Sequence, residues 1–129
     1  MIVGVGIDII EVERLARDLD EKAGLLEEIF SAKEIAYCGR KRYSEQHFAA
    51  RFCAKEALFK ALGSGKRGKM SWRDIEISND TQEAPILRLK GATQERVKRR
   101  GANKIHVTLT HTRQMAAACV ILENNANEE

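Results

Sequence analysis

The stretch H-F-A-A-R-F-C-A-K-E-A-L-F-K-A-L-G, residues His47–Gly63, predicts a long α-helix around which we expect the rest of the chain to be organised. Its large apolar residues recur at spacings of four, seven and three, which places them on one stripe of a helix: Phe48, Phe52, Phe59 and Leu62. The alanines between them favour helix, and Gly63 is placed for a left-handed C-terminal cap. The pattern therefore predicts a long helix with one apolar face.

Glu56 lies beside this stripe rather than opposite it, because its neighbours one helical turn away include Phe52 and Phe59. Lys60 follows one turn later, and the loop Ser64–Lys69 beyond the helix is rich in glycine and cations. A carboxylate in these surroundings suits a metal ion and a phosphate. The alternative, from this helix alone, is an exposed ion pair between Glu56 and Lys60 that contributes about 0.3–0.5 kcal/mol.

The composition is that of an ordinary globular domain: 43% of the 129 residues are hydrophobic, 32% are charged, and the net charge is +3. This length predicts a single domain over residues 1–129, with a polar tail, 124–129, that we expect to be frayed. The mild positive charge permits an acidic or phosphorylated partner but does not by itself indicate nucleic acid.

The three cysteines, Cys38, Cys53 and Cys119, form no C-x-x-C pair. Free thiols in a reducing compartment explain them better than disulfides or zinc. The N-terminus lacks the basic region of a signal peptide, and no apolar run is long enough to cross a bilayer. We expect a cytoplasmic protein, with neither nucleic acid nor a membrane among its partners.

Residues Ile2–Ile10 predict a strand whose two faces differ. One face carries Val3, Val5, Ile7 and Ile9; the other is nearly bare at Gly4 and Gly6, so that another backbone or a ligand could approach it closely. Asp8 is a carboxylate at the far end of the bare face. The alternative for Asp8 is a turn or cap residue at the end of the strand.

The remaining patterns predict an α+β domain with a mainly antiparallel sheet. Helices are expected at Glu11–Leu19, at Ser31–Tyr37 behind an S-x-x-E capping box, and at Gly91–Arg100. Strands are expected at Trp72–Ser78 and Ile86–Lys90, which suggest a hairpin, and at Ile105–Leu109 and Met115–Leu122. The last strand is apolar on both faces and should be central.

Three features could carry chemistry: Asp8, Glu56 with Lys60, and Thr110-His111 at the end of a strand. Mg²⁺ in proteins is typically bound by one or two carboxylates together with water and substrate phosphates. Two carboxylates and a lysine are a sensible minimum for a metal and a pyrophosphate. Alternatively, His111 is a turn residue or a histidine satisfied within the fold, and periodicity does not show that the three features meet in space.

The sequence resembles the small 4′-phosphopantetheinyl transferases known as holo-[acyl-carrier-protein] synthases. The motifs occur in the family's order over almost the whole chain: G-V-G-I-D-I-I-E-V at Gly4–Val12, R-F-C-A-K-E-A-L-F-K-A-L-G at Arg51–Gly63, W-R-D-I-E-I at Trp72–Ile77 and H-V-T-L-T-H-T at His106–Thr112. The K-E-A-x-x-K helix is the most specific of them. The resemblance implies a transferase-like fold with one long central helix.

The resemblance also implies the reaction and its residues. These enzymes transfer the phosphopantetheine arm of coenzyme A to a serine of apo-acyl carrier protein and release adenosine 3′,5′-bisphosphate. By position, Asp8 and Glu56 would bind Mg²⁺, and Glu56 and Lys60 would be catalytic. The residues implied to bind coenzyme A are Lys60, Gly63, Ser64, Gly65, Pro85, Thr110 and His111. Either Glu56 or a metal-bound water could take the serine proton.

A related two-domain class has a second acidic residue at the position of Ile10, so water is expected to complete the coordination here. Small members of the family are homotrimers in which the neighbouring subunit supplies His111, and they serve fatty acid biosynthesis. Acyl carrier proteins are acidic, so Arg14 and Arg17 are candidates for docking them, with an idle solvated helix face as the alternative.

The chain departs modestly from the family pattern. Threonines replace the usual serines at Thr108 and Thr110, Cys53 replaces an alanine, Pro85 lacks its preceding glycine, and Met115 stands where an aromatic residue is common. A rival hypothesis is a non-catalytic module that binds acidic proteins or nucleotides through Arg14, Arg17 and the loop Lys66–Lys69. The sequence does not identify the preferred carrier protein or show whether acylated coenzyme A is accepted.

Overall fold

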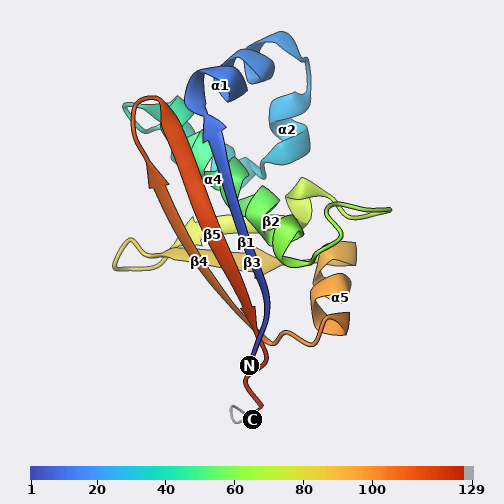
Figure 1. Ribbon diagram of the computed structural model, residues 1–129. Helices are drawn as coiled ribbons and strands as arrows, with labels where there is room; N and C mark the ends of the chain where they lie inside the picture. The colour runs from blue at the N-terminus through green and yellow to red at the C-terminus, as the bar shows by residue number, and fades with distance from the viewer. Residues whose placement is uncertain (127–129) are drawn as a thin grey trace.

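The predicted α+β class is confirmed in a computed structural model that describes residues 1–126 (Figure 1). The elements, in chain order, are β1 (Ile2–Glu11), α1 (Val12–Glu21), α2 (Leu25–Ile29), α3 (Ala32–Gly39), α4 (Ser44–Ala61), the 3-10 helix η1 (Trp72–Asp74), β2 (Ile75–Asn79), β3 (Pro85–Leu89), α5 (Gly91–Arg99), β4 (Lys104–His111) and β5 (Met115–Glu123). The strands and helices that the sequence predicted are present, with small shifts at their ends.

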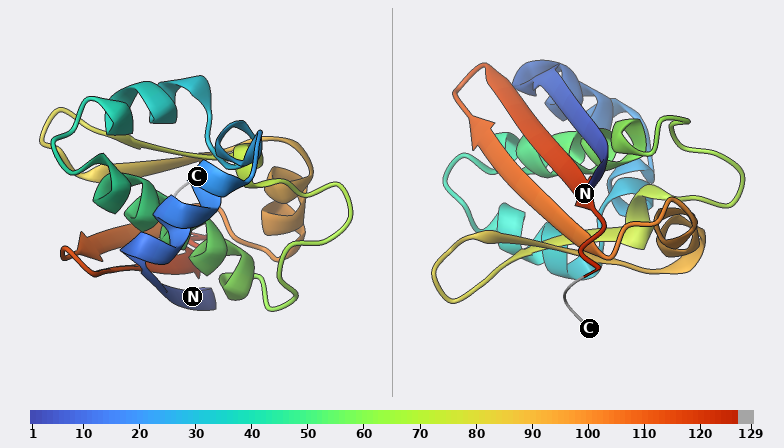
Figure 2. Two further views of the ribbon diagram at one scale, coloured as in Figure 1. Left: turned by 90° about the horizontal axis from the view of Figure 1, so that it is seen from above. Right: turned by 60° about the horizontal axis from the view of Figure 1, so that its bottom comes forward.

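The strands form two antiparallel sheets rather than one. The larger sheet has the order β1-β5-β4, so β5 is central as its two apolar faces predicted. The hairpin β2–β3 is a separate two-stranded sheet that runs across the direction of the long strands (Figure 1). Helices α1–α4 lie on one side of the three-stranded sheet and leave its other face open (Figure 2).

Helix α4 is enclosed around most of its circumference, so the prediction of a single apolar face is wrong. The sheet covers one side of it, and α1, α3 and β2 cover others. Phe48 and Phe52 of the predicted stripe are only partly buried, whereas the charged Arg51 and Lys55 are fully buried. The alanines explain this, because small side chains let neighbouring elements pack closely on several sides of one helix.

The bare face of β1 packs directly on the backbone of α4. A Cβ atom on Gly6 would overlap with the carbonyl oxygen of Ala57 and lie 2.6 Å from the backbone nitrogen of Ala61, and one on Gly4 would overlap with the carbonyl oxygen of Ala61. The two glycines therefore permit the close backbone approach that the sequence suggested. This contact fixes the distance between Asp8 on β1 and the side chains of α4.

A buried ion pair connects α4 to its other neighbours. The Lys55 Nζ atom lies 2.7 Å from Glu34 Oε1 and donates a second hydrogen bond to the Ile29 carbonyl at 2.7 Å. Glu34 also closes the predicted capping box with Ser31 and accepts a bond from the backbone N–H of Ile77. One carboxylate thereby holds α3, α4 and β2 together.

Three details differ from the sequence expectations. The first residues of the expected strand Trp72–Ser78 form η1, because a second capping box between Ser71 and Asp74 favours a helical turn there. Helix α2 was missed, since its five residues are too few to show a period. Asn124 is not frayed: it exchanges hydrogen bonds with Met1, while residues 127–129 of the expected tail lie outside the described part of the chain.

Candidate active site

Asp8 of β1 and Lys60 of α4 form an ion pair between elements far apart in the sequence. The Lys60 Nζ atom lies 2.8 Å from Asp8 Oδ1, with 16% of the Asp8 side chain and 56% of the Lys60 side chain exposed. The hydrogen bond to Asp8 raises the pKa of Lys60 above its usual value. Two of the residues selected from the sequence therefore meet at the open edge of β1.

Glu56 is bound by a residue that the sequence did not single out. Its Oε2 atom accepts a hydrogen bond of 2.7 Å from the indole Nε1–H of Trp72. Within the described residues the ion-pair partner of Lys60 is Asp8 rather than Glu56, so the ordinary helical pair considered from the sequence is not formed. The Glu56 carboxylate instead points to the side of α4 where η1 begins.

Cys53 packs between the two carboxylates and the sheet. Its thiol donates to the carbonyl oxygen of Ala116 at 3.4 Å. Burial, followed by the negative charge of Asp8, a hydrogen bond to it and the charge of Glu56, raises the pKa of this thiol to about 12. Cys53 therefore stays protonated and is neither a nucleophile nor a competing metal ligand.

The donor set fits a hard divalent cation. Asp8 and Glu56 offer carboxylate oxygens from two rigid elements, and no cluster of three histidine, cysteine or acidic side chains suited to a metal occurs within residues 1–126. Zinc sites need three or four protein ligands, whereas Mg²⁺ uses one or two carboxylates and completes its shell with water and phosphate oxygens. The pair therefore matches Mg²⁺ better than zinc.

The loop after α4 carries the predicted residues Gly63, Ser64 and Gly65. Gly63 adopts φ 82° just beyond the helix, which confirms the predicted left-handed cap. Helix α5 and the residue after it supply cations here. Arg96 donates to the Ser64 hydroxyl at 3.4 Å, and Arg100, which donates to the Val3 carbonyl at 3.1 Å, has its guanidinium beside Gly63. The rise of a helix places Gly63 about 10 Å along α4 from Glu56.

Sequence reasoning did not select Arg96 and Arg100 for this loop. The basic end of the α5 segment was visible, but its simplest interpretation was a complement to the helix dipole. The packing of α5 against the rest of the domain decides which arginines turn toward the loop, and that packing leaves no local signal.

Pro85 and His111 line a different cavity, of about 230 Å³, on the far side of α4. Arg51 is buried in its wall with its Nη2 atom 2.8 Å from Asn79 Oδ1, while its Nε atom has no hydrogen-bond partner in the described structure. The guanidinium group also lies 4.4 Å from the ring centre of Tyr37. The cavity thus has a buried guanidinium in its wall, and the acidic Glu83 is also among its lining residues.

Gln46 and His47 hold His111 at this cavity, and both were missed from the sequence. The Gln46 Oε1 atom lies 2.9 Å from His111 Nδ1, so this nitrogen carries the proton and Nε2 is left for another partner. The rings of His47 and His111 meet edge to face with centroids 4.9 Å apart. Burial, and then the neighbouring charge of His111, lower the pKa of His47.

The predicted residues therefore separate into two groups within one chain. His47 and Glu56 are nine residues apart on α4, and at about 100° per residue they project from opposite sides of the helix. Thr110 does not accompany His111, because consecutive strand residues face opposite ways, and it is exposed on the open face of the sheet. Arg14 and Arg17 are exposed on α1, where Arg17 pairs with Glu13 at 3.2 Å.

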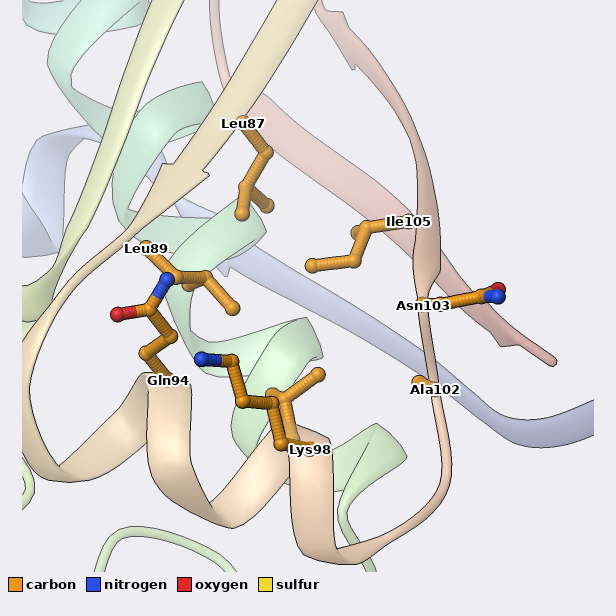
Figure 3. Close-up of a pocket in the computed structure, with 8 residues that line it drawn as sticks. Leu87, Leu89, Gln94, Lys98, Ala102, Asn103 and Ile105 are labelled. Atoms are coloured by element: carbon orange, nitrogen blue, oxygen red, sulfur yellow. The ribbon is translucent and has the colours of Figure 1, made fainter. Parts of the chain in front are cut away.

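A second cavity, of about 360 Å³, lies between β3, α5 and β4. Leu87, Leu89 and Ile105 point toward one another across it, and Lys98 lies at its rim (Figure 3). Its lining includes none of the residues selected from the sequence. The two charged sites on either side of α4 are therefore the places where the predicted residues gather.

Comparison with known proteins shows the family of the chain. Residues 4–120 match the model of the 4'-phosphopantetheinyl transferase superfamily. A holo-[acyl-carrier-protein] synthase from Geotalea daltonii is 44% identical over 124 residues, which cover 95% of this chain and 99% of that protein.

Two solved structures carry ligands. A holo-(acyl-carrier-protein) synthase from Bacillus anthracis, in complex with CoA (3',5'-ADP), is 34% identical with a TM-score of 0.79 and covers 97% of this chain and 99% of that one. The Helicobacter pylori synthase in complex with coenzyme A is 29% identical with a TM-score of 0.79, covering 92% of this chain and 99% of that one. The family match and the fold together establish that this chain belongs to the 4'-phosphopantetheinyl transferase superfamily.

Proposed function

We propose that this protein is a holo-[acyl-carrier-protein] synthase. It transfers 4'-phosphopantetheine from coenzyme A to a serine of apo-acyl carrier protein, giving holo-acyl carrier protein and adenosine 3',5'-bisphosphate. The proposal rests mainly on one observation: Asp8 of β1 lies beside Glu56 and Lys60 of α4. The basic, glycine-rich loop that begins at Gly63 follows directly after the same helix. The named relatives and the coenzyme A complexes of similar structures support the same reaction.

The chemistry requires one bond to form and one to break. The serine oxygen bonds to the phosphorus next to the pantetheine arm, and the bond from that phosphorus to the nucleotide phosphate oxygen breaks. Asp8 and Glu56 would hold Mg²⁺, which in such reactions neutralises the developing charge of the leaving group. Lys60, whose partly exposed ammonium lies beside Asp8, would contact a phosphate oxygen as a point charge.

The proton of the serine hydroxyl must also leave. A water molecule beside Glu56 can accept it, because Trp72 holds Oε2 of this carboxylate and Oε1 is the atom left for the cation. Gly63, Ser64 and Gly65 let the chain approach the ligand closely, and Arg96 and Lys66 add positive charge beside them.

The cavity at His111 suits the adenosine 3'-phosphate end of coenzyme A. Arg51 supplies a buried guanidinium, and His111, whose Nδ1–H donates to Gln46, can donate to a phosphate through Nε2 in its protonated form. Anions bind strongly where charged donors are fixed in a sheltered site. Pro85 lines the same cavity, in keeping with the role that its motif suggests.

One chain holds the two sites on opposite sides of α4, so we propose a homotrimer in which His111 of one subunit faces the carboxylates of the next. The open face of the sheet supports this proposal. Val5, Ile7 and Ile9 form a row there and are 60%, 66% and 65% exposed, with Cys119 and Ile121 of β5 beside them. Large exposed apolar surfaces mark interaction sites.

We place the reaction in fatty acid biosynthesis and in the cytoplasm, a reducing compartment in which three unpaired cysteines remain as free thiols. Across residues 1–126, every helix is too short or too polar to span a bilayer. The acidic carrier protein is the proposed partner of Arg14 and Arg17, whose double substitution by alanine should raise the KM for carrier and weaken its salt dependence.

Mass spectrometry of the carrier protein tests the activity. Apo-acyl carrier protein incubated with the enzyme, coenzyme A and Mg²⁺ should gain the mass of one phosphopantetheine, and chelation of the metal should prevent the gain. Salt-sensitive binding of the carrier without any added mass would instead favour the non-catalytic binding module and overturn the proposal.

Subunit mixing tests the shared site. Glu56→Gln and His111→Ala should each be inactive alone, but in randomly mixed trimers about a quarter of the sites carry both intact residues. Recovered turnover in the mixture is the expected result. If the mixture stays as inactive as its components while native mass spectrometry shows mixed trimers, both residues act within one chain and the arrangement is wrong.

A further inference from the structure

Trp72 is the one tryptophan of the sequence, and it makes three contacts at the carboxylate site. Its indole N–H donates to Glu56 Oε2 at 2.7 Å, and its ring centre lies 6.1 Å from that of Phe52, one turn earlier on α4. On the other side, the Lys66 ammonium lies 4.5 Å from the centre of the same ring. The indole therefore joins the candidate metal ligand to the basic loop.

The backbone that carries Trp72 is fixed independently of Glu56. Ser71 and Asp74 cap the 3-10 helix η1 reciprocally, with bonds of 3.1 Å from Ser71 N to Asp74 Oδ2 and 3.2 Å from Arg73 N to Ser71 Oγ. The buried Thr93 of α5 adds a hydroxyl bond of 2.8 Å to the same carboxylate oxygen. The backbone that carries the indole N–H is therefore held in place by hydrogen bonds that do not involve Glu56.

A rigid donor on one carboxylate oxygen has a chemical consequence. With Oε2 accepting the bond from Trp72, Oε1 of Glu56 is the oxygen better placed to bind a cation, and the plane of the carboxylate is set before the cation arrives. Outer partners of this kind orient metal ligands, and their removal typically weakens metal binding about 10- to 100-fold.

We propose that Trp72 is a positioning residue that orients Glu56 Oε1 toward the divalent cation. Through its contact with Lys66, it also links cation binding to the conformation of the loop Ser64–Lys69. The inference rests on the proposed metal role of Asp8 and Glu56. It assigns to Trp72 a role in metal affinity, and to Lys66 a resting place on the indole from which it can move toward a phosphate.

Titration with Mn²⁺, followed by electron paramagnetic resonance, tests the role without turnover, since Mn²⁺ favours the same oxygen ligands as Mg²⁺. Trp72→Phe keeps an aromatic ring against Phe52 and Lys66 but removes the N–H donor. We expect its Kd for Mn²⁺ to rise about 10- to 100-fold. The matched control is Phe52→Leu, which disturbs the ring packing but leaves the donor, and it should keep the wild-type Kd.

The outcomes separate this inference from the proposed function. If the wild type binds Mn²⁺ and Trp72→Phe binds it equally well, the positioning role is wrong while the metal site stands. If Phe52→Leu weakens binding as much as Trp72→Phe, packing rather than the hydrogen bond is responsible, and the inference also fails. If the wild type does not bind Mn²⁺ even with coenzyme A, the metal site and the inference fall together.

Tryptophan emission gives a readout on the unsubstituted protein, independent of how Trp72→Phe folds. Because the only indole touches both Glu56 and Lys66, Mg²⁺ should change its emission, and coenzyme A added afterwards should change it again as Lys66 leaves the ring. Glu56→Gln should lose the Mg²⁺ step, and Lys66→Met should lose the coenzyme step. If the emission of Trp72 does not change at saturating Mg²⁺, the proposed coupling is wrong.

Discussion

Helix α4 contributes to two charged clusters, one around Lys55 and one around Glu56, which differ in whether their charged atoms are exposed and free to bind a ligand. Lys55 and Glu34 are fully shielded from solvent, with 0% of either side chain exposed, and both oxygens of Glu34 and the ammonium of Lys55 are engaged inside the protein. One residue further along the helix, Glu56 keeps one oxygen free, and its neighbours Asp8 and Lys60 reach solvent.

The comparison teaches how to recognise a site among charged residues. A buried charge is tolerated when every polar atom has a hydrogen-bond partner, and the side chains of such a cluster have no free donor or acceptor with which to bind a ligand. A partly exposed carboxylate held by one fixed donor still has a free oxygen. Burial alone would have directed attention to Lys55, whose pKa is lowered by burial although Glu34 partly offsets the shift.

The largest expected effect is on stability, from breaking the buried cluster. Lys55→Met leaves Glu34 as an unpaired buried charge, and we expect the free energy of unfolding to fall by about 3–5 kcal/mol. Equilibrium denaturation in urea measures it. The double variant with Glu34→Gln removes that charge and should regain part of the loss. A single variant within about 1 kcal/mol of wild type would show that the pair is not a structural unit.

The next effect should appear in turnover and not in stability. Glu56→Gln and Asp8→Asn keep the shape of each side chain but remove a candidate metal ligand, and we expect kcat to fall about 10²- to 10³-fold or more, as when one preorganised group facing a developing charge is lost. Their unfolding free energies should stay within about 1 kcal/mol of wild type, because both side chains are partly exposed. Near-normal turnover in either variant would remove that residue from the site.

A smaller effect should follow from separating β1 and α4. An added methyl group in Gly6→Ala overlaps with the backbone of α4 at Ala57, so we expect a loss of about 1–3 kcal/mol in stability together with weaker Mn²⁺ binding, since Asp8 moves with the strand. Gly39→Ala is the control, because a Cβ at Gly39 meets no atom within 4 Å. Wild-type stability and metal affinity in Gly6→Ala would contradict the packing described here.

The smallest effect concerns the His47–His111 pair. Burial and the neighbouring charges of His111, Arg51 and Lys41 hold the pKa of His47 below its usual 6.5. The unfolded chain therefore binds more protons than the folded one as the pH drops below 6.5, so the folded state loses stability there.

In His47→Phe, an aromatic ring remains against His111 but cannot take a proton. We expect the decline in unfolding free energy from about pH 7 to about pH 5 to be shallower in this variant. Denaturation curves across that range provide the measurement. A pH dependence parallel to that of wild type would show that His47 does not contribute to it.

Sequence reasoning succeeded where one local pattern carries the information. The helix at His47–Gly63, its left-handed cap at Gly63, the capping box at Ser31 and the central strand at Met115–Leu122 each follow from a short run of residues. It failed where several elements contribute. The single apolar stripe was wrong because the sheet, α1, α3 and β2 all cover α4.

Site residues divide in the same way. Asp8, Glu56 and Lys60 could be selected because they stand in motifs, whereas Trp72, Gln46 and Arg51 acquire their partners only through packing. Trp72 had a signal in the W-R-D-I-E-I motif, but a strand position gave no reason to connect it with Glu56, which lies 16 residues earlier.

The sequence by itself determined most of the elements, the α+β class, the family resemblance and the choice of Asp8 and Glu56 as candidate metal ligands, because periodicity, caps and motifs are properties of neighbouring residues. Only the tertiary structure decided which charges are paired. Lys60 forms an ion pair with Asp8 and Lys55 with Glu34, and Glu56 accepts a hydrogen bond from Trp72. His111 lies on the far side of α4. The physical reason is that partners distant in the chain are chosen by how closely backbones can approach, and here two glycines in β1 set that approach.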